Sequence, residues 1–178
     1  KGYPVKPWIL LAVAMLSPVS IYTGAGELSP AASQQRPNLR LPDLEGRQRQ
    51  LDEYRGQVVL VNFWASWCTP CLDEMPSIQR LAAAMRGTPF AVIAVNVGEG
   101  ERRVRAMAER LGLGFPVLLD QDSAVFNQWG ATVLPTTYVL DGEGVVRYLG
   151  RGPLEWDSGD VVEMLKGIAS DEAGSRPQ

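Results

Sequence analysis

The stretch that decides the fold runs from Val58 to Pro76 and reads VVLVNFWASWCTPCLDEMP. Its first six residues, which end at Phe63, form a largely apolar run typical of a strand buried on both faces. A short turn follows over 64–67, and the pattern predicts a helix that begins at or near Cys68. The only two cysteines of the chain, Cys68 and Cys71, therefore lie on the first turn of this helix.

These two cysteines are spaced for thiol–disulfide exchange. Residues three apart share a helix face, so the two sulfur atoms can come within disulfide distance. A helix N-terminus favours the thiolate, which is the form that attacks disulfides. We therefore predict that Cys68 is the attacking sulfur and that Cys71, one turn further in, resolves the mixed disulfide. The alternatives are two inert core thiols or a structural disulfide, although a bridge across so few residues stabilises little.

The cysteines lie in a recognisable sequence context. Trp67-Cys68-Thr69-Pro70-Cys71 resembles the Trp-Cys-x-Pro-Cys active site of thioredoxin-fold proteins. The flanking residues 59–65 and 74–76 are similar to the TlpA/ResA family of membrane-tethered thiol–disulfide oxidoreductases. The resemblance implies a thioredoxin-like α/β fold, with a mixed central β-sheet, helices on both faces and an N-terminal β-hairpin extension. It also implies an enzyme that works through the redox-active Cys68/Cys71 pair, with no metal and no other cofactor.

The resemblance extends to residues outside this motif. The segment Leu134-Pro135-Thr136-Thr137 resembles the one whose cis-proline faces the dithiol, and it leaves the backbone of Leu134 free to pair with a substrate strand. An acidic residue at the position of Glu74 is typical of ResA-like proteins. In an apolar setting beside a thiolate its pKa would rise, and it would then carry the proton that Cys71 loses. The substrate contacts that the resemblance implies are Trp67, Thr69, Pro70, Leu134 and Thr136.

Two interpretations of Glu74 remain open. Asn62 stands where thioredoxin carries a buried aspartate, so Glu74 is a candidate to replace that aspartate. Alternatively, Glu74 is a surface carboxylate that complements the helix dipole, a role that suits the neighbouring Asp73 better.

Composition limits the classes of function. The 178 residues suffice for one domain with a full core. A net charge of −3 offers no basic surface for nucleic acid. The chain has no histidine, which excludes Cys–His nucleophile pairs, and two cysteines alone cannot close a zinc site. The sequence therefore predicts neither a nucleic-acid partner nor a metal.

The N-terminal residues differ from all that follow. Lys1 and Lys6 precede an uncharged stretch from Pro7 to Gly26, a basic region followed by an apolar one. At ~1.5 Å per residue the stretch is about long enough to span a bilayer. We expect residues 1–26 to be a membrane anchor, in preference to a cleaved signal or a buried helix. Lysines before it and Glu27 after it place the catalytic domain outside a bacterial inner membrane, facing the periplasm or the exterior.

The rest of the chain is predicted to form one thioredoxin-like domain over 37–170. A Ser/Pro-rich linker over 27–36 precedes it, and a flexible tail over 171–178 follows. Strands that alternate with helices and end in a hairpin predict a mixed sheet covered on both sides. The arginine-rich face of a helix over 101–111 is interpreted as solvated surface. The predicted elements are a hairpin over 38–50, a helical turn over 51–54, strands over 58–63, 90–97, 117–119, 134–140 and 145–149, and helices from 68 and over 101–111, 123–129 and 158–169.

The leading hypothesis is a reductant that acts outside the cytoplasm. Disulfides form readily there, so a dedicated dithiol is useful where a protein must keep its cysteines reduced. The expected clients are apocytochromes c or copper-site proteins, and a membrane thiol carrier would recharge the enzyme. The alternatives are a peroxiredoxin-like thiol peroxidase, a general disulfide oxidant or isomerase, and a copper or zinc carrier. Against the peroxidase, Ala65 stands in place of the threonine expected three residues before the peroxidatic cysteine.

Overall fold

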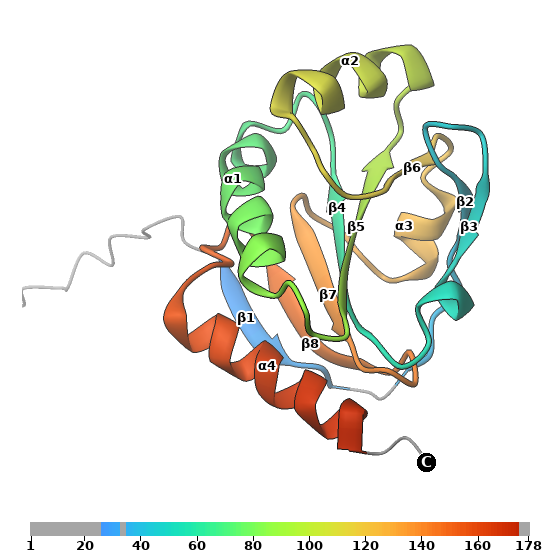
Figure 1. Cartoon of the computed structure of the whole chain (residues 1–178). Helices are drawn as coiled ribbons and strands as arrows, with labels where there is room; N and C mark the ends of the chain where they lie inside the picture. The colour runs from blue at the N-terminus through green and yellow to red at the C-terminus, as the bar shows by residue number, and fades with distance from the viewer. Residues whose placement is uncertain (1–25, 33–34, 175–178) are drawn as a thin grey trace, which may run out of the picture.

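The computed structural model describes residues 26–32 and 35–174, so the predicted anchor lies outside this range except for Gly26. A six-stranded sheet in the order β1-β8-β7-β4-β5-β6 forms the centre (Figure 1). Its strands are β1 (Glu27–Pro30), β4 (Val58–Trp64), β5 (Phe90–Val97), β6 (Val117–Asp120), β7 (Thr136–Leu140) and β8 (Val146–Arg151). Strand β4 is parallel to β5 and antiparallel to β7, so the sheet is mixed, as predicted.

Helices cover both faces of this sheet (Figure 1). They are α1 (Thr69–Ala84), α2 (Glu101–Leu111), α3 (Ala124–Gln128) and α4 (Gly159–Gly174). Every residue of β4 is buried, and its side chains alternate between two hydrophobic clusters. Leu60 packs in the cluster that contains residues of α1 and α4, whereas Phe63 packs in the one that contains residues of α3. The thioredoxin-like fold predicted from the sequence is confirmed.

A small second sheet precedes β4. Strands β2 (Arg40–Pro42) and β3 (Gln48–Gln50) pair antiparallel, and a 3-10 helix, η1 (Leu51–Tyr54), follows them. Between the two strands Asp43 forms an isolated bridge with Leu118 of β6. Its buried carboxylate accepts the backbone N–H groups of Glu45 and Arg47, which fixes the turn.

The structure differs from the prediction at both ends of the domain. Residues 27–30, assigned to the linker, form the edge strand β1, which pairs antiparallel with β8. A serine- and proline-containing segment can do so because an edge strand needs backbone pairing on one side only, which also tolerates Pro30. At the other end, α4 continues to Gly174, four residues into the predicted tail. No helix within the described residues is both long and apolar enough to cross a membrane.

Candidate active site

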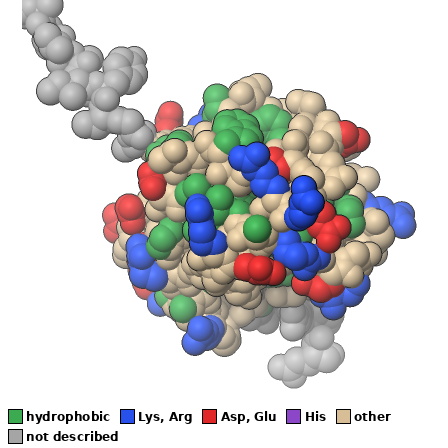
Figure 2. Space-filling view, turned by 90° about the horizontal axis from the view of Figure 1, so that it is seen from above, with side chains coloured by type: hydrophobic (Ala, Val, Ile, Leu, Met, Phe, Trp, Pro, Cys, Tyr) green, Lys and Arg blue, Asp and Glu red, His purple; other side chains and the backbone are tan. Residues whose placement is uncertain are grey.

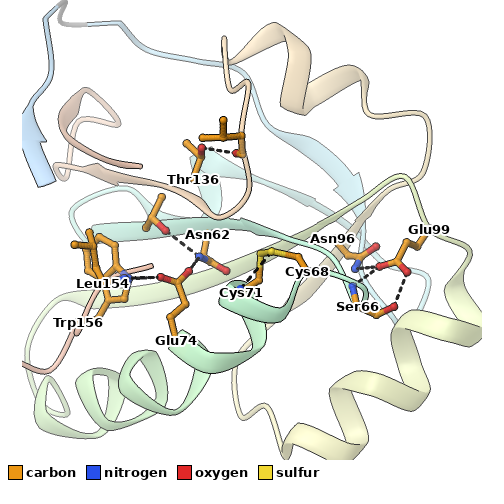
Figure 3. The surroundings of a disulfide bond; sticks show 12 residues. Asn62, Ser66, Cys68, Cys71, Glu74, Asn96, Glu99, Thr136, Leu154 and Trp156 are labelled. Carbon is orange, nitrogen blue, oxygen red and sulfur yellow. Dashed lines mark hydrogen bonds between the residues drawn. A yellow bond between two sulfur atoms is a disulfide. The ribbon is translucent and has the colours of Figure 1, made fainter. Parts of the chain in front are cut away.

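Cys68 and Cys71 form a disulfide at the point where β4 leads into α1 (Figure 3). Their Cα atoms are 5.3 Å apart. Cys68 is the N-cap of α1, and its Sγ accepts the backbone N–H of Cys71 at 3.3 Å. Cys68 is 5% exposed and Cys71 is fully buried. Of the two cysteines, Cys68 is therefore the one that solvent can reach. The unpaired backbone N–H groups at the helix N-terminus would stabilise a thiolate there.

Glu74 lies one helical turn beyond Cys71 and is only 2% exposed. Its Oε1 accepts the side-chain amide of Asn62 at 2.7 Å. Its Oε2 accepts the backbone N–H of Leu154 at 3.1 Å and the indole N–H of Trp156 at 3.2 Å (Figure 3). The interpretation of Glu74 as a surface carboxylate is therefore wrong, and the neighbouring helix position carries the exposed acid.

This burial changes the acidity of Glu74. Removal from water raises the pKa of the Glu74 carboxyl from 4.5 to about 7, although its three hydrogen-bond donors favour the ionised form. The sequence predicted the direction and named burial and a nearby thiolate as its causes. In the oxidised protein burial alone supplies the increase, because the cysteines are joined. A carboxyl with a pKa near neutrality can both accept and release a proton under physiological conditions.

Asn62 links three elements beneath the disulfide. It lies on β4, is fully buried, and donates from Nδ2 both to Glu74 and to the hydroxyl oxygen of Thr137 on β7, the latter at 2.8 Å. Its Oδ1 is buried and has no hydrogen-bond partner in the described part of the chain. The sequence placed Asn62 at the position of the buried aspartate of thioredoxin and named Glu74 as the candidate to replace that aspartate. It gave no sign that the amide would bind Glu74 directly.

The Leu134–Pro135 peptide bond is cis, as predicted. Pro135 directly precedes β7, and Thr136 pairs with Phe63 near the end of β4, so this segment lies at the end of the sheet that carries the disulfide. The carbonyl of Pro135 accepts the N–H of Gly152 at 3.0 Å. Among the described residues, the backbone of Leu134 has no hydrogen-bond partner, so it is open to a substrate strand.

An apolar groove lies beside Trp67, the residue that precedes Cys68. Trp67 and Val133 are 65% and 48% exposed, the two large hydrophobic side chains that stand out on the described surface. They border a groove of about 380 Å³ that Phe126 and Leu134 also line. Figure 2 looks onto the end of the molecule that carries α2, where hydrophobic side chains lie among basic and acidic ones.

The turn before Cys68 is fixed by a buried carboxylate that the sequence analysis missed. Glu99 accepts the backbone N–H of Ser66 and its hydroxyl, each at 2.6 Å, and the side-chain amide of Asn96 at 2.9 Å. Arg103 of α2 adds an ion pair to Glu99 at 3.1 Å and donates to the Ser66 hydroxyl at 2.8 Å. Burial opposes the ionisation of Glu99, but these donors outweigh it and lower its pKa.

A signal for this site was present in the sequence. Glu99 follows the carboxyl end of β5, and polar residues at the carboxyl ends of parallel strands commonly form sites. The arginine-rich face of α2 is largely exposed, as interpreted, but two of its side chains, Arg103 (67% exposed) and Arg105 (40% exposed), also make specific contacts. Arg103 binds Ser66 and Glu99, and Arg105 binds the carbonyl of Leu44. Within the described residues, no cluster of histidine, cysteine or acidic side chains is arranged to hold a metal.

Comparison with known proteins agrees with this geometry. The model of the AhpC/TSA family matches residues 32–149. The thiol–disulfide oxidoreductase ResA of Geobacillus thermodenitrificans is 39% identical over 132 residues, which cover 74% of this chain and 75% of that protein. The chain belongs to the ResA-like branch of the AhpC/TSA family. ResA of Bacillus subtilis is 33% identical over 144 residues, 80% of each chain.

A solved structure matches the ResA-like fold. The thiol:disulfide interchange protein of Chlorobium tepidum, a thioredoxin family protein, superposes with a TM-score of 0.65 at 25% identity. The match covers 77% of this chain and 99% of that one. The protein is therefore a thioredoxin-fold thiol–disulfide oxidoreductase that acts on protein thiols. The family and the enzyme class predicted from the sequence are confirmed.

Proposed function

We propose that this ResA-like protein is an exported, membrane-tethered reductant that opens disulfides in apocytochromes c or in copper-site proteins. The observation that carries the proposed chemistry is the buried carboxyl of Glu74, one helical turn from Cys71 and with a pKa near neutrality. A dithiol that gives two electrons to a client must also give up two protons. Glu74 is the group that can take the proton from the buried sulfur.

The first step is attack by Cys68 on the client. In the reduced protein the Sγ of Cys68 lies at the N-terminus of α1, where the helix dipole and the N–H of Cys71 stabilise a thiolate. This thiolate forms a bond with one client sulfur. The client disulfide breaks, and its second sulfur leaves as a thiolate that takes up a proton from solvent. The product is a mixed disulfide between Cys68 and the client.

The second step releases the client. The thiol proton of Cys71 passes to the carboxylate of Glu74, and the Cys71 thiolate attacks the Sγ of Cys68. The mixed disulfide breaks, and the remaining client sulfur leaves as a thiolate that is protonated. The enzyme ends in the oxidised form, with Cys68 joined to Cys71. Two electrons have moved from the dithiol to the client, and no further cofactor takes part.

The client is proposed to bind as an extended segment across the disulfide. The free backbone of Leu134 offers main-chain hydrogen bonds, and the exposed indole of Trp67 offers apolar contact. Thr69 and Pro70 are exposed on the first turn of α1, and Thr136 follows the cis-proline. Trp67, Thr69 and Pro70 flank Cys68 in the chain, so a bound client would present its disulfide to the attacking sulfur. Thr136 is buried, and its hydroxyl donates to the carbonyl of Val133.

Export and tethering are proposed from the sequence of residues 1–26, a basic start followed by an uncharged apolar stretch. With Glu27 after this stretch, the catalytic domain faces the periplasm or the exterior of a bacterial inner membrane. In an oxidising compartment the dithiol must be regenerated after each cycle. A thiol carrier in the membrane is the proposed electron donor.

Identification of trapped clients tests this function. In Cys71→Ala, the mixed disulfide cannot be resolved and should accumulate, and mass spectrometry of the trapped partners should find apocytochromes c or copper-site proteins. Cells that lack the protein should lose c-type cytochromes or copper-oxidase activity, and an external thiol should restore them. Normal cytochrome and oxidase levels without a redundant reductase would exclude these clients. Rapid consumption of peroxide by the reduced protein would favour the peroxidase alternative.

A further inference from the structure

Within the described part of the chain, each of the three hydrogen bonds to the side-chain carboxyl of Glu74 comes from an N–H donor (Figure 3). The backbone N–H of Leu154 and the indole N–H of Trp156 donate in every protonation state, because neither group has an acceptor atom. They suit a carboxylate but cannot accept the hydrogen of a carboxylic acid. Asn62 is the exception among the three contacts, since its amide carries an acceptor oxygen as well as a donor nitrogen.

The acceptor oxygen of Asn62 is unused. Its Oδ1 is buried and has no hydrogen-bond partner in the described part of the chain, which is a costly arrangement in a protein interior. A half-turn of the amide exchanges the positions of Oδ1 and Nδ2. Oδ1 then faces the Oε1 of Glu74 and the hydroxyl of Thr137, which now lie 2.7 and 2.8 Å from Nδ2. A hydroxyl can donate as readily as it accepts, so Thr137 suits both orientations.

We propose that the side-chain amide of Asn62 turns over when Glu74 takes up a proton, and that Asn62 thereby positions the proton that Cys71 releases. With Glu74 ionised, Nδ2 donates to Oε1. With Glu74 protonated, its hydroxyl donates to Oδ1, and the hydroxyl of Thr137 does the same. In each state one atom of the amide bonds both Glu74 and Thr137, and the other atom has no partner. The number of hydrogen bonds made by Asn62 is therefore the same in the two protonation states. The inference rests on the proposed role of Glu74.

The remaining surroundings leave this exchange undisturbed. No charged side chain within the described residues contacts Glu74. The elements packed against it contribute Asn62 from β4, Thr137 from β7 and the segment 154–156. The titratable groups of these elements and of α1 are the two thiols, once reduced, the exposed Asp73, Tyr138, whose hydroxyl donates to the carbonyl of Trp129, and Glu155 and Asp157, which bind Arg80 near the surface. The amide of Asn62 is therefore the group that can respond directly to the proton on Glu74.

The orientation of the amide can be followed by NMR on the oxidised, isotope-labelled full chain. From about pH 9 to about pH 5 the Glu74 carboxyl should titrate in the ¹³C spectrum. Nuclear Overhauser contacts from the Asn62 NH₂ protons to Thr137 should be present at high pH and lost at low pH, with the same midpoint. Contacts that stay unchanged while the Glu74 carboxyl titrates would overturn the proposal. The measurement needs neither client nor dithiol, so its outcome is independent of the redox function.

The substitution Glu74→Gln provides a second test. A glutamine can donate its amide to the Oδ1 of Asn62 while its carbonyl accepts from Leu154 and Trp156, as the protonated acid would. The low-pH pattern of Asn62 contacts should therefore persist at every pH in this variant. A pattern that still changes with pH would contradict the proposal. Asp73→Asn, at the exposed neighbouring position, is the matched control. In this variant the Asn62 contacts should change with pH as they do in the wild type.

The rate at which Cys71 resolves a mixed disulfide tests whether the amide of Asn62 takes part in proton transfer. Asn62→Leu removes donor and acceptor at nearly constant volume, and resolution of a preformed mixed disulfide by Cys71 should slow by about tenfold or more. The pH dependence of this step should also change, which a loss of packing alone would not cause. A variant that folds and resolves the mixed disulfide with the wild-type pH profile would show that Asn62 has no part in proton transfer.

Discussion

The carboxylate of Glu99 holds Ser66 by both its backbone N–H and its hydroxyl, each at 2.6 Å, across 33 positions of the chain. Ser66 lies two residues before Cys68, in the turn that leads from β4 to α1. Because this contact joins the turn to the loop between β5 and α2, it holds in place the turn that leads into Cys68 at the start of α1.

Loss of this contact should therefore cost both stability and activity. Glu99→Ala leaves the buried N–H of Ser66 unpaired, and the free energy of unfolding should fall by about 2 kcal/mol. Glu99→Gln keeps an acceptor oxygen and should lose less. Urea unfolding and the rate of disulfide exchange measure the two effects. Glu101→Ala, which removes an exposed ion pair with Arg105, is the control and should cost at most about 0.5 kcal/mol. Equal losses in the two alanine variants would contradict the role of Glu99.

Burial of Glu74 should make the oxidised protein less stable as the pH rises from about 4.5 to about 7. In this window the unfolded chain loses the Glu74 proton while the folded chain keeps it, so the unfolded state is favoured progressively. At about 1.4 kcal/mol for each tenfold change in proton affinity, the total is about 3 kcal/mol. Denaturant unfolding across this range should show the slope in the wild type and not in Glu74→Gln. A slope of equal size in both proteins would rule out Glu74 as its source.

The same carboxyl should control how disulfide exchange depends on pH. In the proposed mechanism Glu74 accepts the proton of Cys71, so the rate of resolution should rise as the carboxyl ionises near neutrality. In Glu74→Gln the profile should be flatter and the rate lower, while the domain stays folded. Stopped-flow measurement of client release from a preformed mixed disulfide gives the profile. If the variant and the wild type have the same profile, Glu74 does not carry the proton.

The two cysteines should differ sharply in reactivity. In the oxidised structure Cys68, at the helix start, is 5% exposed and Cys71 is fully buried, and we expect the same difference in the reduced protein. A short pulse of iodoacetamide followed by mass spectrometry should label Cys68 almost alone, because the accessible thiolate reacts first. Cys68→Ala should abolish exchange with clients. Preferential labelling of Cys71 would reverse the assignment of the two sulfurs.

Substitution of the two tryptophans that flank the turn, Trp64 and Trp67, should distinguish an effect on stability from an effect on client binding. Trp67 is 65% exposed, so Trp67→Ala should change the free energy of unfolding by at most about 0.5 kcal/mol but raise the KM for protein clients. Trp64 is fully buried, and Trp64→Ala should cost about 3–5 kcal/mol through the cavity it leaves. Thermal unfolding and client kinetics on both variants make the comparison. An unchanged KM in Trp67→Ala would remove Trp67 from the binding surface.

The parts of the fold that the sequence predicted well are those decided by local pattern. The apolar runs of β4 and β5 and the helical period of α2 gave bounds within one residue of the structure. Strand β1 was missed because its residues carry no strand signal of their own. It exists through backbone pairing with β8, about 120 positions away, where Ser29 faces Leu149.

The residues of the candidate site also fall into those that a local pattern predicts and those that it does not. The sequence located Cys68, Cys71 and the cis-proline, because a short motif and a family resemblance mark them. The pocket around Glu74 was predicted only in outline, since Leu154 and Trp156 approach it from 80 and 82 positions further along the chain. No local pattern encodes such a contact, which depends on how α1 packs against the segment that follows β8.

The place where β1 begins has a consequence for protein engineering. A Cβ atom on Gly26 would lie 2.5 Å from the carbonyl oxygen of Gly152, so only glycine allows the two segments to approach so closely. The next residue pairs with Arg151, which pairs in turn with Thr136 beside the cis-proline. A peptide fused before Gly26 would thus start about 10 Å, two strand spacings, from Thr136. A client sequence attached there would meet Cys68 as an intramolecular reactant, at an effective concentration set by the length of its linker.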